Sequence, residues 1–507
     1  MPELEEPETG RAEVPAASEG PRQNGKMPGK KVRVTLSLTG FVCLIGIGAP
    51  LAYKFEPRAV IQIGIPESQM GNHIQETLEK WKPEEHGRIE LEAIPLSYED
   101  LLFSETDTRP PPFDVIMVDD PWLAQLAHWG RLAAVPESQF RDFFTGFAPE
   151  FLHVAYYQDP KDVKTPRRPA LAALTLKGQT HPNLEQLDKL HGSYTLYGLP
   201  YVGNVQVIAR HSPASGKDDL HVHLAAGHAG WPSLVNPGTQ FYMRMGSNNS
   251  AVADFLPLLW SEGGCLIAKN AQGQEISGLS DSGPALAALD LSLKLVASGP
   301  IQYARFKEED VQTYLKNTPD SIGVSWLAYR SGLLRQASPQ NGNGGIRWYS
   351  MPTVDTEVKN SCNSDVPLVD TGKRSPGTLG AWLLAVNSSS KQRDEAWKFV
   401  HWVLQQVRDV KTPPSAAECS DEIEPVGNDP LNGFPTPFED QLTCGSRKAV
   451  RNSRPRPAHP RWREIEDALG FRVRQVHWGT LKSTEAMHDV EGELNEILTR
   501  TDARQTR

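Results

Sequence analysis

The sequence predicts an α/β protein with at least two lobes, each built on a mostly parallel sheet flanked by helices. The chain has 507 residues, which exceeds the roughly 250–300 residues at which a single hydrophobic core stops growing. Apolar runs typical of strands alternate with segments of helical period, and this order produces parallel sheets. A run at residues 113–122 (FDVIMVDDPW) contains a strand apolar on both faces, as expected for a strand covered by helices on each side.

The same run predicts a ligand site. Ligands of open α/β sheets bind at the carboxyl ends of strands, and here Asp119, Asp120, Pro121 and Trp122 follow the apolar strand. Carboxylates accept hydrogen bonds from hydroxyls, and an indole offers a flat apolar face, so the chemistry suits a sugar. We expect Asp120 and Trp122 to contact the ligand and Asp119 to be structural. The alternative is a helix N-cap aspartate and a core tryptophan.

Composition and motifs argue against several functions. The net charge of -10 argues against a nucleic-acid surface. Neither a GxSxG, HExxH or P-loop motif nor a CxxC spacing occurs, so no cofactor or metal site is expected. Asp119 and Asp120 would point to opposite faces of a strand, which makes them a poor acid/base pair for a hydrolase. We therefore do not expect an enzyme.

The N-terminal part predicts export. Residues 1–32 are rich in Pro, Gly and Glu and are expected to be disordered. Residues 34–53 carry no charge and are preceded by Lys30, Lys31 and Arg33. This length suits a minimal membrane span, and the positive-inside rule then exports the rest of the chain. Residues 33–53 form either a signal peptide or an uncleaved signal anchor, and we favour the anchor.

The remaining elements follow in order along the chain. Strands are expected at residues 59–65, 89–94, 197–209, 321–326, 346–352 and 380–386. Helices are expected at 73–81, 98–103, 122–129, 251–260, 284–297, 396–404, 462–469 and 486–498. The basic, proline-rich residues 158–190 read as an irregular excursion. Ser388, Ser389 and Ser390 are expected to cap the helix that follows them.

Five cysteines match no zinc spacing. Cys43 lies in the apolar segment, which leaves Cys265, Cys362, Cys419 and Cys444 in the exported part. In an oxidising compartment Cys419 and Cys444 can close a loop, which would stabilise the chain by about 3 kcal/mol. The alternative is four unpaired buried thiols.

Seven segments, taken in order, resemble the family 1 extracellular solute-binding proteins of bacterial ABC importers, a carbohydrate-binding group that includes maltose-binding proteins. They are FDVIMVDDPWLAQLAHWGRLAAV, YGLPYVGNVQ, FLPLLWSEGG, IGVSW, IRWYSMP, GTLGAWLLAVNSSSKQRDEAWKFVHWVL and PRPAHPRWREIEDAL. The chain departs from the family in the excursion at 158–190, in a compressed Gly- and His-rich stretch after Arg210, and in its long N-terminal tail.

This resemblance implies a two-lobed periplasmic-binding-protein fold of type II with the ligand in a cleft between the lobes. By analogy, residues 58–196 plus 375–430 form the first lobe, and residues 197–374 plus 431–507 form the second. It also implies a monomeric extracytoplasmic or periplasmic protein, tethered to the inner membrane if 33–53 is retained. Such a protein captures a carbohydrate and delivers it to the permease subunits of an ABC importer.

The expected ligand contacts combine aromatic plates with polar side chains. They are Asp120, Trp122, Tyr201, Asn204, Trp260, Trp326 and Trp382. For each of them the alternative is a core or hinge position. Two other functions use the same fold: a membrane-tethered sensor or scaffold without a transport role, and a degenerate member that binds protein instead of sugar.

Overall fold

The computed structural model describes residues 59–97, 112–158, 168–169, 174, 182, 184–190, 193–211, 230–234, 239–280, 282–329, 346–352, 377–409 and 436–500. All of them belong to one compact unit, Pro57–Arg507. The predicted tail 1–32, the apolar segment 33–53 and the predicted helix 98–103 lie outside these ranges. Within these ranges, no helix has the length and apolar character of a membrane span.

A nine-stranded sheet organises this unit, in the order β2-β1-β3-β12-β6-β10-β7, with β11 added beside β6 and β13 beside β12. Its strands are β1 (Ala59–Pro66), β2 (Ile89–Leu96), β3 (Val115–Asp119), β6 (Leu199–His211), β7 (Gln240–Tyr242), β10 (Ser321–Trp326), β11 (Ile346–Ser350), β12 (Thr378–Val386) and β13 (Arg454–Pro455). Short pairs, β4 (Tyr156–Tyr157) with β5 (Thr195–Leu196) and β8 (Ile267–Lys269) with β9 (Glu275–Ser277), form two small separate sheets.

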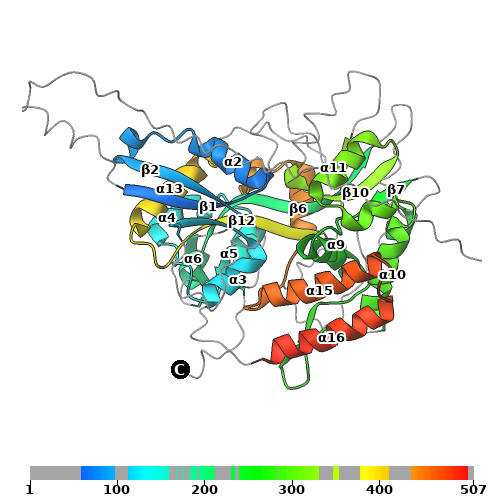
Figure 1. Cartoon of the computed structure of the whole chain (residues 1–507). Helices are drawn as coiled ribbons and strands as arrows, with labels where there is room; N and C mark the ends of the chain where they lie inside the picture. The colour runs from blue at the N-terminus through cyan, green and yellow to red at the C-terminus, as the bar shows by residue number, and fades with distance from the viewer. Residues whose placement is uncertain are drawn as a thin grey trace, which may run out of the picture. The chain divides into compact units, whose positions relative to one another are not determined.

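Strand direction separates the two lobes from the strands that join them. β1 is parallel to β2 and β3 in the first lobe, and β10 is parallel to β7 in the second. The long strand β6 pairs antiparallel with β12 in its first half and with β10 and β11 in its second half. β12 is in turn antiparallel to β3. β6 and β12 therefore run from one lobe to the other, and the predicted α/β class is confirmed (Figure 1).

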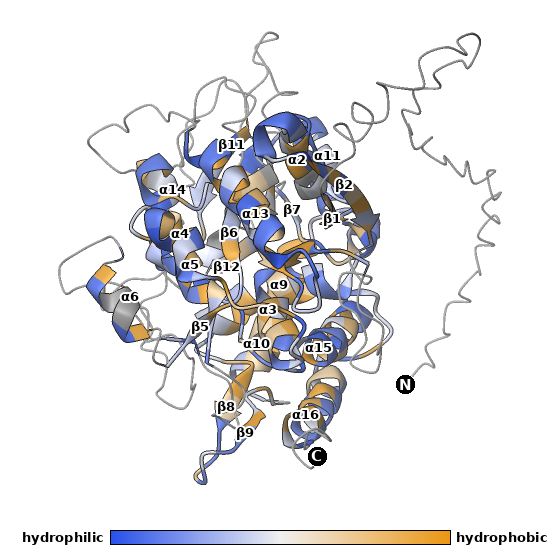
Figure 2. Cartoon of the chain, turned by 90° about the vertical axis from the view of Figure 1, so that its left-hand side faces the viewer, coloured by the Kyte–Doolittle hydropathy of each residue, from blue (hydrophilic) through white to orange (hydrophobic). Residues whose placement is uncertain are grey.

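Helices cover both lobes (Figure 1). Those of the first lobe are α2 (Gln69–Leu78), α3 (Asp120–His128), α4 (Glu137–Phe144), α5 (Pro149–Ala155), α6 (Leu184–Leu190) and α13 (Arg393–Arg408). Those of the second are α8 (Gly230–Ser233), α9 (Asn248–Ser261), α10 (Pro284–Val296), α11 (Glu308–Asn317), α15 (Trp462–His477) and α16 (Ser483–Thr499), while α14 (Cys444–Asn452) packs on β6 and β11. Figure 2 shows α9 and α10 largely in the colour of apolar residues, as expected for helices buried on several sides.

N-capping explains where the structure departs from the predicted helix boundaries. α2 and α9 begin earlier than predicted, because the hydroxyls of Ser68 and Ser247 accept hydrogen bonds from backbone N–H groups of their first turns. The prediction that the serines at 388–390 cap α13 is wrong, since Gln392 occupies the N-cap and α13 begins at Arg393. Ser390 instead donates a hydrogen bond to Asp114 and accepts one from the backbone of Gln392.

The structure differs from the sequence interpretation in the excursion at 158–190 and in the cysteines. Residues 184–190 of the predicted irregular excursion form the helix α6. Cys265 and Cys444 are both disulfide-bonded, so the alternative of four unpaired thiols is wrong. Cys419 lies outside the described residues, and its pairing with Cys444 stays a prediction.

Candidate functional site

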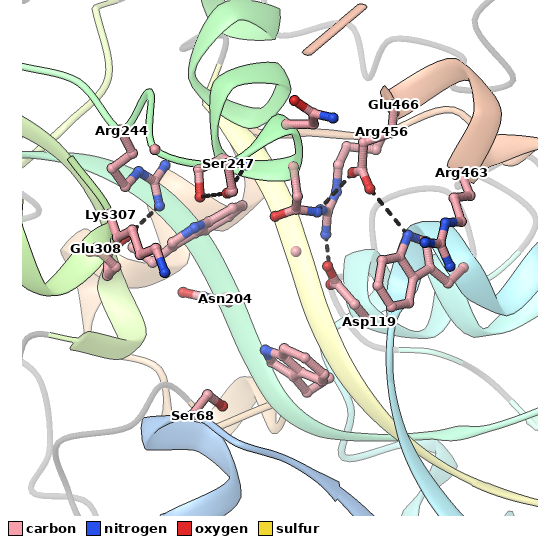
Figure 3. Close-up of a pocket in the computed structure, with 18 of the residues that line it drawn as sticks. Ser68, Asp119, Asn204, Arg244, Ser247, Lys307, Glu308, Arg456, Arg463 and Glu466 are labelled. Carbon is pink, nitrogen blue, oxygen red and sulfur yellow. Dashed lines mark hydrogen bonds and ion pairs between the residues drawn. The ribbon is translucent and has the colours of Figure 1, made fainter. Parts of the chain in front are cut away.

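A cavity of about 570 Å³ lies between the lobes, within the ~300–1,000 Å³ typical of small-molecule sites. Its wall consists of Ser68 at the start of α2, residues of the helices α3, α9, α11 and α15, and residues of the strands β6, β10 and β12. In Figure 3, the labelled residues that surround it are Ser68, Asp119, Asn204, Arg244, Ser247, Lys307, Glu308, Arg456, Arg463 and Glu466. Both lobes therefore supply polar groups to one cavity.

Four helices begin at this cavity. Their N-cap residues, Ser68 of α2, Asp119 of α3, Ser247 of α9 and Lys307 of α11, all line it. The first turn of a helix leaves backbone N–H groups without intrahelical acceptors and carries a partial positive charge. The side-chain oxygens of Ser68, Asp119 and Ser247 each accept a hydrogen bond from one such N–H group, so the caps place polar side chains at the cavity wall.

Three tryptophans supply apolar surface to the same wall. Trp382 of β12 and Trp326 at the end of β10 are half-buried, whereas Trp122 of α3 is buried. The indole N–H of Trp122 donates a hydrogen bond to Oε2 of Glu466 over 3.4 Å. Trp326 and Trp382 consequently offer the larger ring surfaces to a ligand.

Trp326 is held in a cationic environment. The guanidinium carbons of Arg244 and Arg456 lie 5.2 Å and 5.8 Å from the centre of its ring system, within the range of cation–π attraction. A Cβ atom at Gly380 would approach the ring to 3.1 Å. The ring therefore packs directly on the backbone of β12, which fixes its position at the cavity.

A buried charge cluster lies on one side of the cavity. The Nη2 atom of Arg456, which follows β13, lies 2.7 Å from Oδ1 of Asp119 and 2.6 Å from Oδ1 of Asp120. Arg168 approaches the other oxygen of Asp120 to 3.7 Å. Burial raises the pKa of Asp120 to about 6, although Arg456 and Arg168 favour its charged form. The two aspartates at the carboxyl end of β3 thus share one arginine.

A second cluster lies on the opposite side, within the second lobe. Arg244 forms ion pairs with Asp254 of α9 and, over 2.6 Å, with Glu308 of α11. Glu308 also accepts a hydrogen bond of 2.8 Å from the hydroxyl of Ser325, and Asp254 accepts one of 2.8 Å from the side chain of Gln206. Because all these groups are buried and paired, they hold α9 and the start of α11 in place around the cavity.

Glu466 of α15 is a buried acceptor in the cavity wall. Its carboxylate accepts hydrogen bonds from the indole N–H groups of Trp122 and Trp462 and from the side-chain amide of Asn249 over 2.7 Å. Burial raises its pKa from the ordinary value of 4.5 to about 7, while the charge of Arg456 opposes and that of Asp119 adds to this shift. The group is therefore protonated in the folded protein under conditions in which it is ionised in the unfolded chain.

The raised pKa predicts a pH-dependent stability. A carboxyl whose pKa is raised on folding stabilises the folded state below about pH 4.5, and this contribution is lost as the pH rises to about 7. Glu466→Gln keeps the shape and removes the charge. We expect the variant to gain on the order of 2 kcal/mol over the wild type between pH 5 and pH 8, measured by urea unfolding. If the free energies of unfolding of the two proteins differ by the same amount at pH 5 and at pH 8, the raised pKa of Glu466 is contradicted.

The predicted site residues fall into two groups. Trp122, Asn204, Trp326 and Trp382 line the cavity, although the side-chain oxygen of Asn204 already accepts hydrogen bonds from the backbone N–H groups of Val205 and Ala328. Asp119, expected to be structural, caps α3, pairs with Arg456 and also lines the cavity.

The other three predicted residues are not among the described residues that line the cavity. Asp120 is fully buried against Arg456. The hydroxyl of Tyr201 is 2.6 Å from Nδ1 of His73, and Trp260 is buried beneath Arg454. Ligand contact through these residues stays a prediction to which this geometry adds no support.

Sequence reasoning missed the polar residues of the second lobe. Ser247, Asn248, Asn249 and Ser250 at the start of α9 line the cavity, and a polar run of this kind before an apolar segment is the signature of a helix start. In contrast, nothing local marks Arg244 or Arg456. Across the described part of the chain, no group of three His, Cys, Asp or Glu side chains is arranged to hold a metal ion.

Neither models of protein families nor curated protein sequences match this chain. Solved structures do. Maltose-bound MalE3 of T. maritima is 18% identical with a TM-score of 0.55, and the match covers 87% of this chain and 100% of that chain. The GacH receptor of Streptomyces glaucescens, solved unliganded and with acarbose, is 13% identical with a TM-score of 0.57, covering 88% and 100%. An ABC transporter solute-binding protein of Agrobacterium radiobacter in complex with ribitol is 15% identical with a TM-score of 0.59, covering 87% and 99%. The chain therefore has the two-lobed fold of periplasmic binding proteins.

Proposed function

We propose that this protein captures a carbohydrate in the cleft between its lobes and delivers it to the permease subunits of an ABC importer. The observation that carries the proposal is the cavity wall, in which the half-buried rings of Trp326 and Trp382 stand beside hydrogen-bonding groups from both lobes. The structures that share the fold were solved with maltose, acarbose and ribitol, which supports a ligand rich in hydroxyls.

The chemistry of the wall fits a pyranose. A sugar ring presents apolar C–H groups on its faces and hydroxyls around its rim, so an indole can stack on a face while polar groups take the rim. A plate that buries roughly 60–80 Å² contributes about 2 kcal/mol at about 25 cal/mol per Å². After the cost of association, two plates and several hydrogen bonds give a binding free energy of about -8 kcal/mol. This free energy corresponds to a dissociation constant in the micromolar range.

The crossing strands supply the motion that capture requires. Hinge closure of two domains around a ligand takes place at a few residues of the connecting strands. β6 carries Pro200 and Gly203 where it leaves the first lobe, and β12 carries a register shift between Trp382 and Leu383. Closure would therefore bring the second-lobe groups towards Trp382 and bury the ligand.

An extracytoplasmic location is part of the proposal. Disulfides persist in oxidising compartments, and the bonded Cys265 and Cys444 support export of the unit that contains them. Tethering through residues 33–53, a monomeric state and the absence of catalysis remain proposals that rest on the sequence. The sensor or scaffold alternative depends on the same N-terminal segment.

A thermal-shift screen of the purified protein tests the proposed function. The probes are mono-, di- and oligosaccharides together with sugar alcohols. A ligand that binds the folded state stabilises it by about 2.7 kcal/mol at a hundredfold excess over its dissociation constant. We expect at least one carbohydrate to raise the melting temperature in a concentration-dependent manner, and the absence of any shift across the panel would overturn the proposal.

A further inference from the structure

Glu466 gives the cavity a buried carboxyl whose hydrogen-bond partners among the described residues are all donors. Its Oε1 atom accepts from the indole N–H of Trp462 over 3.1 Å and from the side-chain amide of Asn249 over 2.7 Å. Its Oε2 atom accepts from the indole N–H of Trp122 over 3.4 Å. Glu466 is 4% exposed and lines the cavity. The carboxyl is therefore held in the cavity wall by donors from α3, α9 and its own helix.

The two oxygens of this carboxyl differ in what they can still bind. Each carboxyl oxygen has two lone pairs, and Trp462 and Asn249 occupy both of those on Oε1. The contact between Oε2 and Trp122 is longer than the usual distance of about 2.7–3.2 Å for an N–H···O bond. A proton that binds this carboxyl therefore lies on Oε2, the oxygen with room for a further partner.

A protonated Oε2 requires an acceptor. A buried donor that lacks one costs about 1–3 kcal/mol. The indole of Trp122 cannot serve, because its nitrogen is a donor and carries no acceptor lone pair. The hydroxyls of a carbohydrate can serve, since each hydroxyl oxygen accepts hydrogen bonds as well as donating one. Neutral Glu466 is therefore complementary to a ligand hydroxyl in the cavity.

The surroundings of Glu466 let it exchange a proton near neutral pH. Burial raises its pKa to about 7, the charge of Arg456 opposes this shift, and that of Asp119 adds to it. Figure 3 shows these three side chains on the same side of the cavity. Arg456 directs its guanidinium at Asp119 and Asp120. The other packed elements contribute the uncharged Trp122 from α3 and Asn249 from α9, and α15 itself contributes the mutually paired Arg463 and Asp467.

We propose that Glu466 binds the ligand as a neutral carboxyl, donating a hydrogen bond from Oε2 to a hydroxyl oxygen of the carbohydrate, so that ionisation of this side chain weakens binding. The inference rests on the proposed function and adds a specificity-determining residue to its site. Because the ligand binds the neutral form, binding raises the pKa of Glu466 further and takes up a proton. Affinity is then highest below about pH 6 and falls as the pH rises through about 7.

Calorimetric titration of the purified protein at about pH 6 and about pH 8 tests this role. The probe is the carbohydrate of the thermal-shift panel that raises the melting temperature most. A carboxyl with a pKa of about 7 is about 90% neutral at pH 6 and about 10% neutral at pH 8. The dissociation constant of the wild type should therefore rise by about tenfold. Titrations at pH 7 in phosphate and in Tris, which differ in ionisation enthalpy, should show uptake of about half a proton per ligand.

Glu466→Gln separates this carboxyl from every other titrating group. The amide keeps a carbonyl for Trp462 and Asn249 and places a permanent donor where Oε2 stood. The variant should bind at pH 8 about as tightly as the wild type binds at pH 6, without proton uptake. Glu464→Gln is the matched control, since Glu464 lies on the same helix, its side chain is 41% exposed, and it pairs with Arg500 outside the set of described residues that line the cavity. It should keep the pH dependence of the wild type.

The outcomes separate the two proposals. If the wild type binds no carbohydrate at either pH, the proposed function fails and the role of Glu466 fails with it. If the wild type binds with an affinity that does not fall from pH 6 to pH 8, or if Glu466→Gln keeps the fall, the role of Glu466 alone is overturned. Weak binding of a cooperatively unfolding Glu466→Gln at both pH values also overturns it. Should this variant not fold, the proton count of the wild type decides, and a count of zero overturns the role.

Discussion

Replacement of Arg456 by methionine is expected to lower the free energy of unfolding by about 3–5 kcal/mol, the cost of removing one partner from a buried ion pair. Arg456 is buried, and its guanidinium contacts Asp119 and Asp120 at 2.7 Å and 2.6 Å. Without it, two buried carboxylates lie next to each other, and Arg168 lies 3.7 Å from Asp120. Urea unfolding at neutral pH measures the change.

Arg463→Met is the control for this variant. Arg463 also lines the cavity, but its side chain is 40% exposed and lies 3.6 Å from Asp467 on the same helix. An exposed pair of this kind contributes about 0–1 kcal/mol, so the control should unfold almost as the wild type does. A loss below about 1 kcal/mol in Arg456→Met would show that the cluster contributes little to the stability of the fold.

Replacement of Trp382 by alanine is expected to weaken carbohydrate binding by about tenfold or more, because a stacked plate contributes about 2 kcal/mol and about 1.4 kcal/mol corresponds to a tenfold change. Trp382 is half-buried and opposes Asp119 across the ladder of β12 and β3. Its removal should change stability less than affinity. Calorimetric titration with the saccharide that stabilises the protein most gives the affinity.

Trp402→Ala is the matched control, since Trp402 of α13 is also half-buried but packs edge-on against Trp81, at 5.0 Å between ring centres, away from the residues that line the cavity. It should lose stability and keep affinity. Trp326→Ala should lose both, because the Trp326 ring also packs against Arg244 and Arg456. Unchanged affinity in Trp382→Ala would remove this ring from the binding site.

The fold was predictable because its signals are local. The apolar run of β3, the interrupted strand β6 and the amphipathic α13 and α15 each show their period within a short window, and an α/β protein follows from their order. Helix starts were predicted less well. Ser68 and Ser247 lie several residues before Ile74 and Ala251, where the predicted periodic segments begin, so hydrophobic periodicity alone places α2 and α9 too late.

The aromatic part of the candidate site was partly predictable. Trp382 and Trp326 follow small residues on strands, where the lack of neighbouring bulk leaves a ring accessible, and both line the cavity. Trp260 also precedes glycines, but it ends an almost wholly buried helix and is core. A glycine that ends a helix leaves no such space beside a ring.

The ionic part of the site was not predictable from one sequence. Arg456 lies more than 330 positions from the aspartates that it pairs with, and Glu466 is 344 positions from Trp122. Such pairs arise only when distant parts of the chain come together in the fold, and no local pattern encodes them. The raised pKa of Glu466 has the same origin, since burial by α3, α9 and α15 causes it.

The central claim is that the cleft binds carbohydrate, and a calorimetric titration of the wild-type protein tests it most directly. The titrant is the saccharide that gives the largest thermal shift. We expect one site per chain with a binding free energy of about -8 kcal/mol, which corresponds to a dissociation constant in the micromolar range, and weaker binding in Trp382→Ala. Absence of binding heat at several temperatures with every saccharide, from a protein that melts cooperatively, would contradict it.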